Sequence, residues 1–393
     1  MKTIHLVSQF VWTIGMVGCL QMLTNLPAAA QPAEGTPASS NIGQSGYPRI
    51  LPDNRVVFQI RAPNAGQVQI NLGRNYDMKK DDSGVWTVTT APQDAGFHYY
   101  SLVVDGVSIS DPASQSFFGT GRMSSAIEIP ESSVDFYTVK GVPHGDIRSK
   151  PYFSKVTKSW RRLFVYAPPG YDQETGQKYP VLYLQHGGGE DETGWAVQGK
   201  TASILDNLIA AGKARPMLVV MDNGNLPSAG GAPGGYSSAA MAGFADELMD
   251  NIVPFIESNY RVKADAKNRA LAGLSMGGGQ AFYVGLGHRD KFSSIGVFST
   301  GLFGGINNNA GNPFNAEEQM PGILTNTKAF NDSLKVFYIS VGEQDPRLEP
   351  TKTAVADFKS HGLKVEFTSF PGGHEWQVWR KSLHDFTPRL FKP

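Results

Sequence analysis

A chain of 393 residues is long enough for two domains that each bury a core of their own. Its 35 basic and 35 acidic residues cancel, so no overall field would recruit nucleic acid or an anionic membrane surface. After the N-terminal segment, no stretch reaches the ~20 consecutive apolar residues that a membrane span needs.

The N-terminal segment has the features of a secretory signal. Lys2 precedes an apolar stretch at residues 10–20, and three alanines at residues 28–30 provide a cleavage site of the A-x-A type. We therefore expect residues 1–30 to be a signal peptide and the mature protein to be secreted or periplasmic. It would have no disulfides, because Cys19 is the only cysteine. The residues before Cys19 also resemble a bacterial lipoprotein acylation site, so a lipid anchor there is the alternative.

A flexible leader and a small β-domain are expected next. Residues 31–45 are rich in Pro, Ala, Ser and Gly, which predicts a flexible leader. Residues 46–131 consist of short alternating apolar runs separated by turn residues, which predicts an all-β, immunoglobulin-like sandwich. Its expected strands include residues 56–60, 68–70, 85–89 and 99–104.

Residues 132–393 alternate strand-like and helix-like segments, which predicts a doubly wound α/β sheet of the α/β-hydrolase type. The expected central strands are near-continuous apolar or mixed runs at residues 181–185, 217–221, 269–272, 294–298, 335–341 and 364–370. A helix between the second and third of these strands is expected to bend at Pro254. Its apolar face recurs every four residues, at Phe244, Leu248, Ile252 and Ile256.

The pentapeptide Gly273-Leu274-Ser275-Met276-Gly277 has the G-x-S-x-G pattern of a serine nucleophile elbow. In such an elbow the serine lies on a strained strand-to-helix turn, and both flanking positions are glycine because a Cβ there would clash. The turn exposes the Ser275 hydroxyl and directs the N–H of Met276 at a developing oxyanion. A glycine-rich turn without chemistry is the alternative.

A serine nucleophile needs a general base within hydrogen-bond reach, and histidine is the expected type. Among the eight histidines, His374 lies on a loop between the last expected strand and the final helix. This position is C-terminal to Ser275, as the chain order of α/β-hydrolases requires. The others fall in the signal, the sandwich, the interdomain hinge or predicted helices, and His186 precedes a glycine run. An ordinary loop histidine is the alternative for His374.

The third member of a triad should leave an intervening strand. Asp345 follows the expected strand at residues 335–341 and is our choice for orienting the imidazole. Glu343 is the competitor because the register of a loop cannot be read from sequence, whereas Asp357 falls within a predicted helix. For the oxyanion hole, the run at residues 187–189 lets backbone N–H groups approach a substrate, and Gly188 is the expected second donor beside Met276.

These motifs make the region from about residue 150 to the end resemble carbohydrate esterase family one, the esterase-D-like feruloyl and acetyl xylan esterases. The matching strings are residues 142–146, 165–171, 179–189, 194–195, the elbow at 273–277 and 372–374. The resemblance implies that Ser275, Asp345 and His374 form a triad that works without a cofactor. It also implies ester bonds on plant polysaccharide, commonly ferulate or acetate on arabinoxylan.

Tryptophans near the expected site are candidates for substrate binding. Trp195 follows the oxyanion loop, and Trp376 and Trp379 lie just after His374, so a phenolic ring or a sugar could stack on them. Packing in the core is the alternative for each of them.

The sandwich resembles the glycogen-binding-type module, family forty-eight of the carbohydrate-binding modules, which precedes some of these esterases. Residues 99–106 and 111–112 carry that likeness. Its aromatic residues include Tyr76 and Trp86, but the sequence does not show an exposed pair. A structural role as a lid or spacer over the active site is the alternative.

The sequence therefore predicts a secreted serine carboxylesterase that acts on a plant polysaccharide or an acylated oligosaccharide through an acyl-enzyme on Ser275. Feruloyl groups are the first expectation and acetyl groups the second. The alternatives are an acyltransferase with the same triad and a carbohydrate-binding protein with an inactive hydrolase domain. No metal site is expected, because the chain has neither a cysteine cluster nor a His-x-x-x-His motif.

Overall fold

The structure, a computed structural model, describes residues 34–131, 134–226, 237–305 and 314–392. The predicted signal segment, with Cys19, lies outside these residues. Gly35–Pro393 form one compact unit, and the predicted boundary between residues 131 and 132 stays a prediction. No helix in the described ranges is long and apolar enough to cross a membrane.

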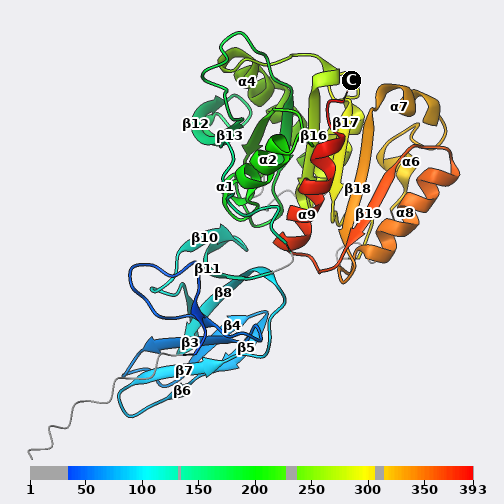
Figure 1. Ribbon diagram of the computed structural model, residues 1–393. Helices are drawn as coiled ribbons and strands as arrows, with labels where there is room; N and C mark the ends of the chain where they lie inside the picture. Colours follow the sequence, from blue (N-terminus) through cyan, green and yellow to red (C-terminus); the bar gives the residue numbers. More distant parts are fainter. Residues whose placement is uncertain (1–33, 132–133, 227–236, 306–313, 393) are drawn as a thin grey trace, which may run out of the picture. The chain divides into compact units, whose positions relative to one another are not determined.

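The N-terminal part contains two sheets, both antiparallel, as expected for an all-β module (Figure 1). One sheet has the strand order β1 (Thr36–Pro37), β2 (Arg49–Ile50), β3 (Val56–Arg61), β7 (Val85–Thr89) and β6 (Lys79–Lys80). The other has the order β10 (Ser116–Gly119), β11 (Arg122–Ile129), β8 (Gly96–Val104), β4 (Val68–Leu72) and β5 (Arg74–Asp77), with β9 (Val107–Ile109) beside β8. Alternate residues of both sheets, such as Phe58, Ile70 and Tyr100, form one core. The immunoglobulin-like label stays a prediction.

Part of the predicted leader belongs to this sandwich, which corrects the expectation of a flexible segment at residues 31–45. β1 pairs with β2, and Asn41 forms a bridge with Ser114. Ala38 is buried in the sandwich core and its N–H donates to the Pro48 carbonyl at 2.9 Å. This segment is ordered although it is rich in small residues, because neighbouring segments supply hydrogen-bond partners for its backbone.

The C-terminal part is built on one mixed sheet of eight strands in the described residues. Their order is β12 (Asp146–Ser154), β13 (Ser159–Ala167), β15 (Leu218–Asp222), β14 (Val181–Gln185), β16 (Arg269–Leu274), β17 (Ser294–Phe298), β18 (Val336–Gly342) and β19 (Glu366–Phe370). β13 runs antiparallel to both of its neighbours, β12 and β15, and all other pairs in this sheet are parallel. The six predicted central strands are confirmed, with bounds that differ by at most two residues.

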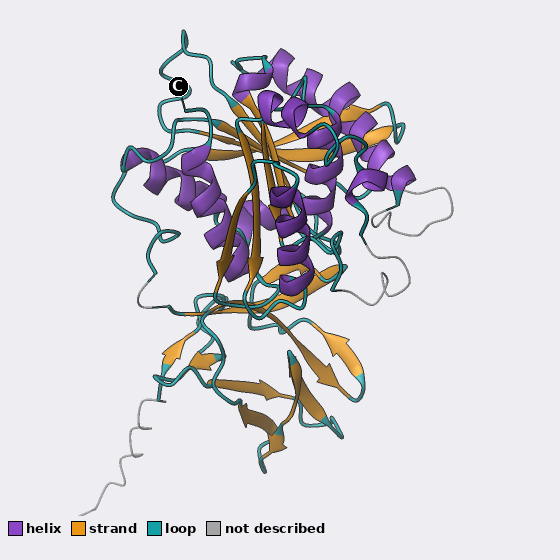
Figure 2. Cartoon of the chain, turned by 90° about the vertical axis from the view of Figure 1, so that its right-hand side faces the viewer, coloured by secondary structure: helices purple, strands orange, loops and turns teal. Residues whose placement is uncertain are grey.

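Helices cover both faces of this sheet (Figure 2), as a doubly wound arrangement requires. Along β14, Val181 and Tyr183 face one core whereas Leu182 and Leu184 face the other. The helical segments are α1 (Thr193–Val197), α2 (Thr201–Ala210), α3 (Ser238–Glu247), η1 (Leu248–Ile252), α4 (Val253–Asn259), η2 (Ala266–Asn268), α5 (Met276–Gln280), η3 (Ala281–Gly285), α6 (Ala316–Gln319), α7 (Thr327–Ser333), α8 (Leu348–Ser360), α9 (Trp376–Phe386) and η5 (Thr387–Arg389).

The helix that the sequence predicts to bend at Pro254 runs without a break from α3 to α4. A π-helical turn, η1, lies between these two α-helical segments. Its predicted apolar face is buried throughout, at Phe244, Leu248, Ile252 and Ile256. Pro254 lies in the first turn of α4, directly after the π-turn η1. Proline has no N–H to donate to the preceding turn, so the regular hydrogen-bond ladder cannot continue through this position.

A buried ion pair joins the sandwich to the last helix. Arg380 of α9 is fully buried, and its guanidinium donates to both carboxylate oxygens of Glu128 on β11, at 2.6 and 3.0 Å. Its Nε donates to the Gln198 carbonyl at 2.8 Å. Phe97 and Ala126 of the sandwich belong to the same apolar cluster as α9. The two parts of the chain therefore share a core instead of meeting only through a linker.

We expect Glu128→Ala to lower the free energy of unfolding by about 2–4 kcal/mol, because it leaves the Arg380 guanidinium buried without its counter-charge. Urea unfolding would measure the change. Glu366→Ala is the matched control, since Glu366 pairs with Arg389 at the surface, where such pairs contribute at most about 1 kcal/mol. Equal losses in the two variants would contradict a structural role for the Arg380 pair.

Candidate active site

Ser275 occupies the sharp turn between β16 and α5. Its backbone has φ 51° and ψ −114°, a strained conformation for a residue with a side chain. A Cβ on Gly273 would overlap the Gly277 backbone, and one on Gly277 would overlap the backbone of His186. The Ser275 N–H donates to the Phe298 carbonyl at 2.8 Å, which ties the turn to β17. Glycine is therefore required at both positions, because any side chain there would clash with the backbone, as the motif predicts.

The structure brings the three predicted triad residues together from three separate loops. His374 Nε2 lies 3.0 Å from the Ser275 hydroxyl, and His374 Nδ1 lies 2.7 Å from Asp345 Oδ2. The His374 and Trp379 rings pack at nearly a right angle, with 5.0 Å between their centres. With Nδ1 donating to the carboxylate, Nε2 is free to accept the serine proton.

Asp345 is held as an anion in a buried position. Burial by itself would raise the pKa of this carboxyl, but the hydrogen bonds from His374 and from Arg347 outweigh it, and the net pKa lies below its ordinary value. Oδ1 accepts bonds from the backbone N–H and the guanidinium of Arg347, each at 3.0 Å. An ionised Asp345 would stabilise a positive charge on the imidazole.

The two competing carboxylates lie elsewhere. Glu343 is exposed and its only side-chain hydrogen bond in the described residues is a long one, 3.4 Å, from the Ser369 hydroxyl. Asp357 lies within α8 and pairs with His361. Of the three candidates, Asp345 is the one that contacts His374.

The predicted oxyanion loop faces Ser275. Gly187 and Gly188 line the same cavity as the serine, and a Cβ on Gly187 would come within 2.6 Å of Leu274. Met276 is the first residue of α5, so its N–H has no carbonyl one turn earlier in that helix. These positions are compatible with the proposed donors Gly188 and Met276.

His186, which the sequence left without a role, supports this loop. Its Nε2 accepts the Gly224 N–H at 3.0 Å, which places the ring proton on Nδ1, 2.8 Å from the Gly187 carbonyl. Burial lowers the pKa of His186, so the ring stays neutral. The loop that carries Gly187 and Gly188 is thereby fixed to the segment after β15.

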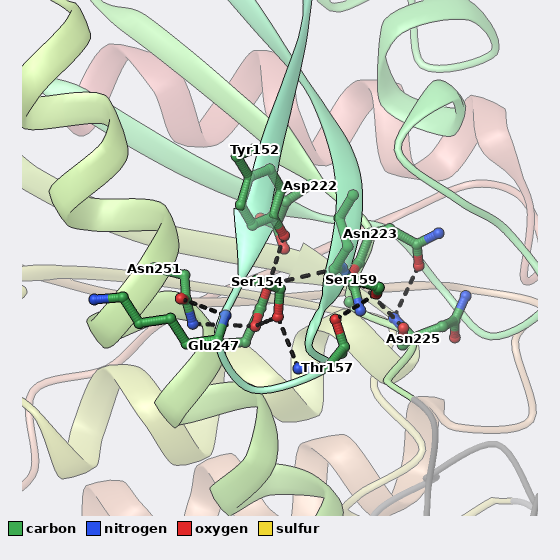
Figure 3. A network of polar contacts seen from close by, with 12 residues as sticks. Tyr152, Ser154, Thr157, Ser159, Asp222, Asn223, Asn225, Glu247 and Asn251 are labelled. Atoms are coloured by element: carbon green, nitrogen blue, oxygen red, sulfur yellow. Dashed lines mark hydrogen bonds and ion pairs between the residues drawn. The ribbon is translucent and has the colours of Figure 1, made fainter.

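A buried polar network contacts the segment after β15, at Asn223 and Asn225 (Figure 3). The fully buried Glu247 carboxylate accepts from the hydroxyls of Tyr152 and Ser154, each at 2.6 Å. Arg161 lies beside Glu247 and donates to the carbonyls of Asn223 and Asn225. Asn225 in turn donates to the Glu190 carbonyl at 2.7 Å. The network therefore connects the β12–β13 hairpin and the end of α3 to the end of the oxyanion loop.

A cavity of about 400 Å³ opens over Ser275 and His374. Its lining combines aromatic rings with a few polar groups, the composition of a pocket for a small organic group. The lining residues are Leu72, Gly73, Gln93, Phe97, His98, Tyr99, Thr120, Gly187, Gly188, Glu190, Leu274, Ser275, His374, Glu375, Trp376 and Trp379.

The predicted substrate-binding tryptophans have different positions. Trp376 and Trp379 line the cavity, although Trp376 is only 1% exposed, and Trp379 also contacts the His374 ring. Trp195 does not line the cavity: it is 1% exposed, donates from Nε1 to the Gln185 carbonyl at 2.8 Å and packs edge-on against Trp376. The alternative of core packing therefore describes Trp195.

The sequence suggested a lid over the active site as one alternative for the sandwich, but it did not indicate which residues of the sandwich line this cavity. His98 and Tyr99 line it although they precede Ser275 by more than 170 residues of chain. No local pattern could indicate this, because it depends on how β8 packs against α9. Trp86, in contrast, is buried in the sandwich and donates to the Ala62 carbonyl, so it offers no exposed stacking face.

Glu190 is a buried carboxyl at the edge of the cavity. Burial raises its pKa to about 8, and the backbone N–H of Glu190 donates to Gly187 within the oxyanion loop. Its Oε1 lies 3.4 Å from the Tyr99 hydroxyl. Glu190 is therefore protonated and neutral at neutral pH.

This raised pKa predicts a stability that falls as the pH rises. Between the ordinary value of 4.5 and about 8, the folded protein retains a proton on Glu190 that the unfolded chain has lost. Glu190→Gln cannot ionise, so near pH 9 it should exceed the wild type in free energy of unfolding by on the order of 2–4 kcal/mol, with little difference near pH 4. Unfolding curves across this range would measure the gap, with the exposed Glu343→Gln as control. A gap that does not change with pH would contradict a neutral Glu190.

Comparisons with known proteins agree with this geometry. The family described as "Putative esterase" matches residues 154–390. The Endo-1,4-beta-xylanase/feruloyl esterase of Xylanibacter ruminicola is 35% identical over 395 aligned positions, which cover 95% of this chain and 50% of that protein. The chain thus spans half the length of that relative.

Among solved structures, a ferulic acid esterase is 28% identical, with a TM-score of 0.54, over 63% of this chain and 98% of the other. The enterobactin esterase of Shigella flexneri covers 85% of this chain and 92% of its own, with a TM-score of 0.60. At 17% identity, that likeness shows the fold alone. The fold is that of esterases of the α/β-hydrolase type with a mixed sheet. The chain therefore belongs to the esterase family, that is, to the carboxylic-ester hydrolases.

Proposed function

We propose that this protein hydrolyses ester-linked acyl groups on plant cell-wall polysaccharide such as arabinoxylan, with feruloyl groups as the first choice and acetyl groups as the second. The observation that carries the proposal is the chain of contacts from Ser275 through His374 to Asp345 beneath an aromatic-lined cavity. The names of the Xylanibacter ruminicola relative and of the ferulic acid esterase support the choice of acyl group.

The proposed reaction has two halves. Ser275 Oγ attacks the ester carbonyl while His374 Nε2 takes its proton, and the backbone N–H groups of Met276 and Gly188 stabilise the oxyanion. The tetrahedral intermediate expels the sugar oxygen, which receives the proton from His374, and the acyl group remains on the serine. Water then attacks the acyl-enzyme by the same route and releases the free acid. Asp345 stays ionised throughout and stabilises the imidazolium.

The cavity favours a flat aromatic acyl group over acetate. Tyr99, Trp376 and Trp379 line it, and aromatic rings attract one another in edge-on or offset geometries. An acetyl group would leave most of a 400 Å³ cavity filled with water. The predicted signal at residues 1–30 supports a secreted or periplasmic location, where such a substrate is found.

Release of ferulate from methyl ferulate and of acetate from acetylated xylan, compared in wild type and Ser275→Ala, tests the proposed function. We expect ferulate release that falls by at least about 10³-fold in the variant, because the nucleophile is gone. Acetate release alone would reassign the acyl group. Hydrolysis that survives in Ser275→Ala would contradict the mechanism.

Asp345→Asn should lower kcat by roughly 10³–10⁴-fold with little change in KM, because the imidazole loses the anion that orients it and stabilises its charge. Glu343→Gln, two residues away and exposed, is the matched control and should retain wild-type kinetics on methyl ferulate. A large loss in Glu343→Gln together with an active Asp345→Asn would reverse the assignment of the acid.

A further inference from the structure

The β-sandwich supplies part of the wall of the cavity around Ser275. Phe97, His98 and Tyr99 of β8 and Thr120 of the β10–β11 turn line it together with Ser275, His374 and the oxyanion loop. A module that only tethers the enzyme to a polysaccharide would not need to line the cavity that holds the nucleophile.

Tyr99 connects the sandwich to three residues of the hydrolase part. Its hydroxyl accepts from Gln198 Nε2 at 2.9 Å and from Trp376 Nε1 at 3.4 Å. The same oxygen lies 3.4 Å from Glu190 Oε1. Trp376 is two residues after His374, and Glu190 ends the oxyanion loop. One hydroxyl group of the sandwich therefore contacts the segments that carry the base and the oxyanion donors.

The β10–β11 turn makes a second contact with the oxyanion loop. The Gly121 N–H donates to the Gly189 carbonyl at 2.7 Å. Gly189 has φ +79°, and a Cβ there would come within 3.0 Å of Gly121. Gln198 also donates to the Phe118 carbonyl at 2.9 Å, and a Cβ on Gly119 would overlap the Tyr99 hydroxyl. The turn, Tyr99 and the loop are thus packed without space to spare.

We propose that the β-sandwich is a working part of the active site, in which the β10–β11 turn and Tyr99 hold the oxyanion loop in place and close one side of the substrate cavity. Tyr99 is a positioning residue, because it acts through Glu190 and Trp376. The inference rests on the proposed function, since it concerns the same site. It predicts that the sandwich affects hydrolysis of a small ester that carries no sugar.

The test uses adjacent tyrosines of the full-length chain. Tyr99→Phe and Tyr100→Phe remove the same atom from neighbouring positions on β8. The Tyr100 hydroxyl faces the sandwich core, where it donates to Asp111 at 2.8 Å. We expect Tyr99→Phe to lower kcat/KM on methyl ferulate about tenfold or more, because displaced oxyanion donors weaken transition-state binding. Tyr100→Phe should lower the melting temperature but keep wild-type kcat/KM.

Thr120→Trp provides a second measurement that does not depend on the buried hydroxyl. Thr120 is exposed and lines the cavity, so a larger side chain should fold normally and raise KM for methyl ferulate several-fold by occupying the cavity. If Tyr99→Phe does not fold, the KM of Thr120→Trp for methyl ferulate tests the inference by itself.

Wild-type kinetics on methyl ferulate in a folded Tyr99→Phe or in Thr120→Trp would overturn the inference. So would equal losses of kcat/KM in Tyr99→Phe and Tyr100→Phe, since both would then report the stability of the sandwich. A wild-type enzyme that is inactive on methyl ferulate and on p-nitrophenyl acetate would instead contradict the proposed function.

Discussion

The structure of the site depends on the close approach of backbones at the nucleophile elbow. Ser275 adopts φ 51° and ψ −114° because Gly273 and Gly277 leave no atoms in its way and the Phe298 carbonyl holds its N–H. A conformation of this kind costs on the order of 1–3 kcal/mol and persists only where the surroundings determine it. The apolar cores on the two faces of the sheet provide that support. The strain places the hydroxyl within 3.0 Å of His374 and leaves the Met276 N–H at the start of a helix.

The oxyanion loop is held by buried polar groups instead of by a regular element. Burial disfavours the charged forms of His186 and Glu190. The buried Glu247 carboxylate accepts hydrogen bonds from the hydroxyls of Tyr152 and Ser154. Removing a charge from water is expensive unless hydrogen bonds replace the lost solvation. Such a network is therefore rigid once it is satisfied, and rigidity is what oxyanion donors need, because reorganisation during the reaction would reduce their stabilisation of the transition state.

Sequence reasoning succeeded where the signal is local and failed where it depends on packing. The apolar runs of β14 and β17 have the predicted bounds, and the residues of the elbow are dictated by sterics within a few positions. Chain order placed His374, but only the structure separates Asp345 from Glu343, because two residues of loop determine which carboxylate reaches the ring. The core position of Trp195 and the cavity position of Tyr99 depend on contacts between segments far apart in the chain, and neither residue has a distinguishing neighbour in the sequence.

The central claim is that the acyl group passes through Ser275. Rapid quenching of the enzyme in acid during turnover of methyl ferulate, followed by mass spectrometry of its peptides, tests this directly. A feruloyl group on the peptide that contains Ser275, absent when Ser275→Ala is treated in the same way, is the expected result. Turnover without any acylated peptide, or the group on another residue, would contradict it.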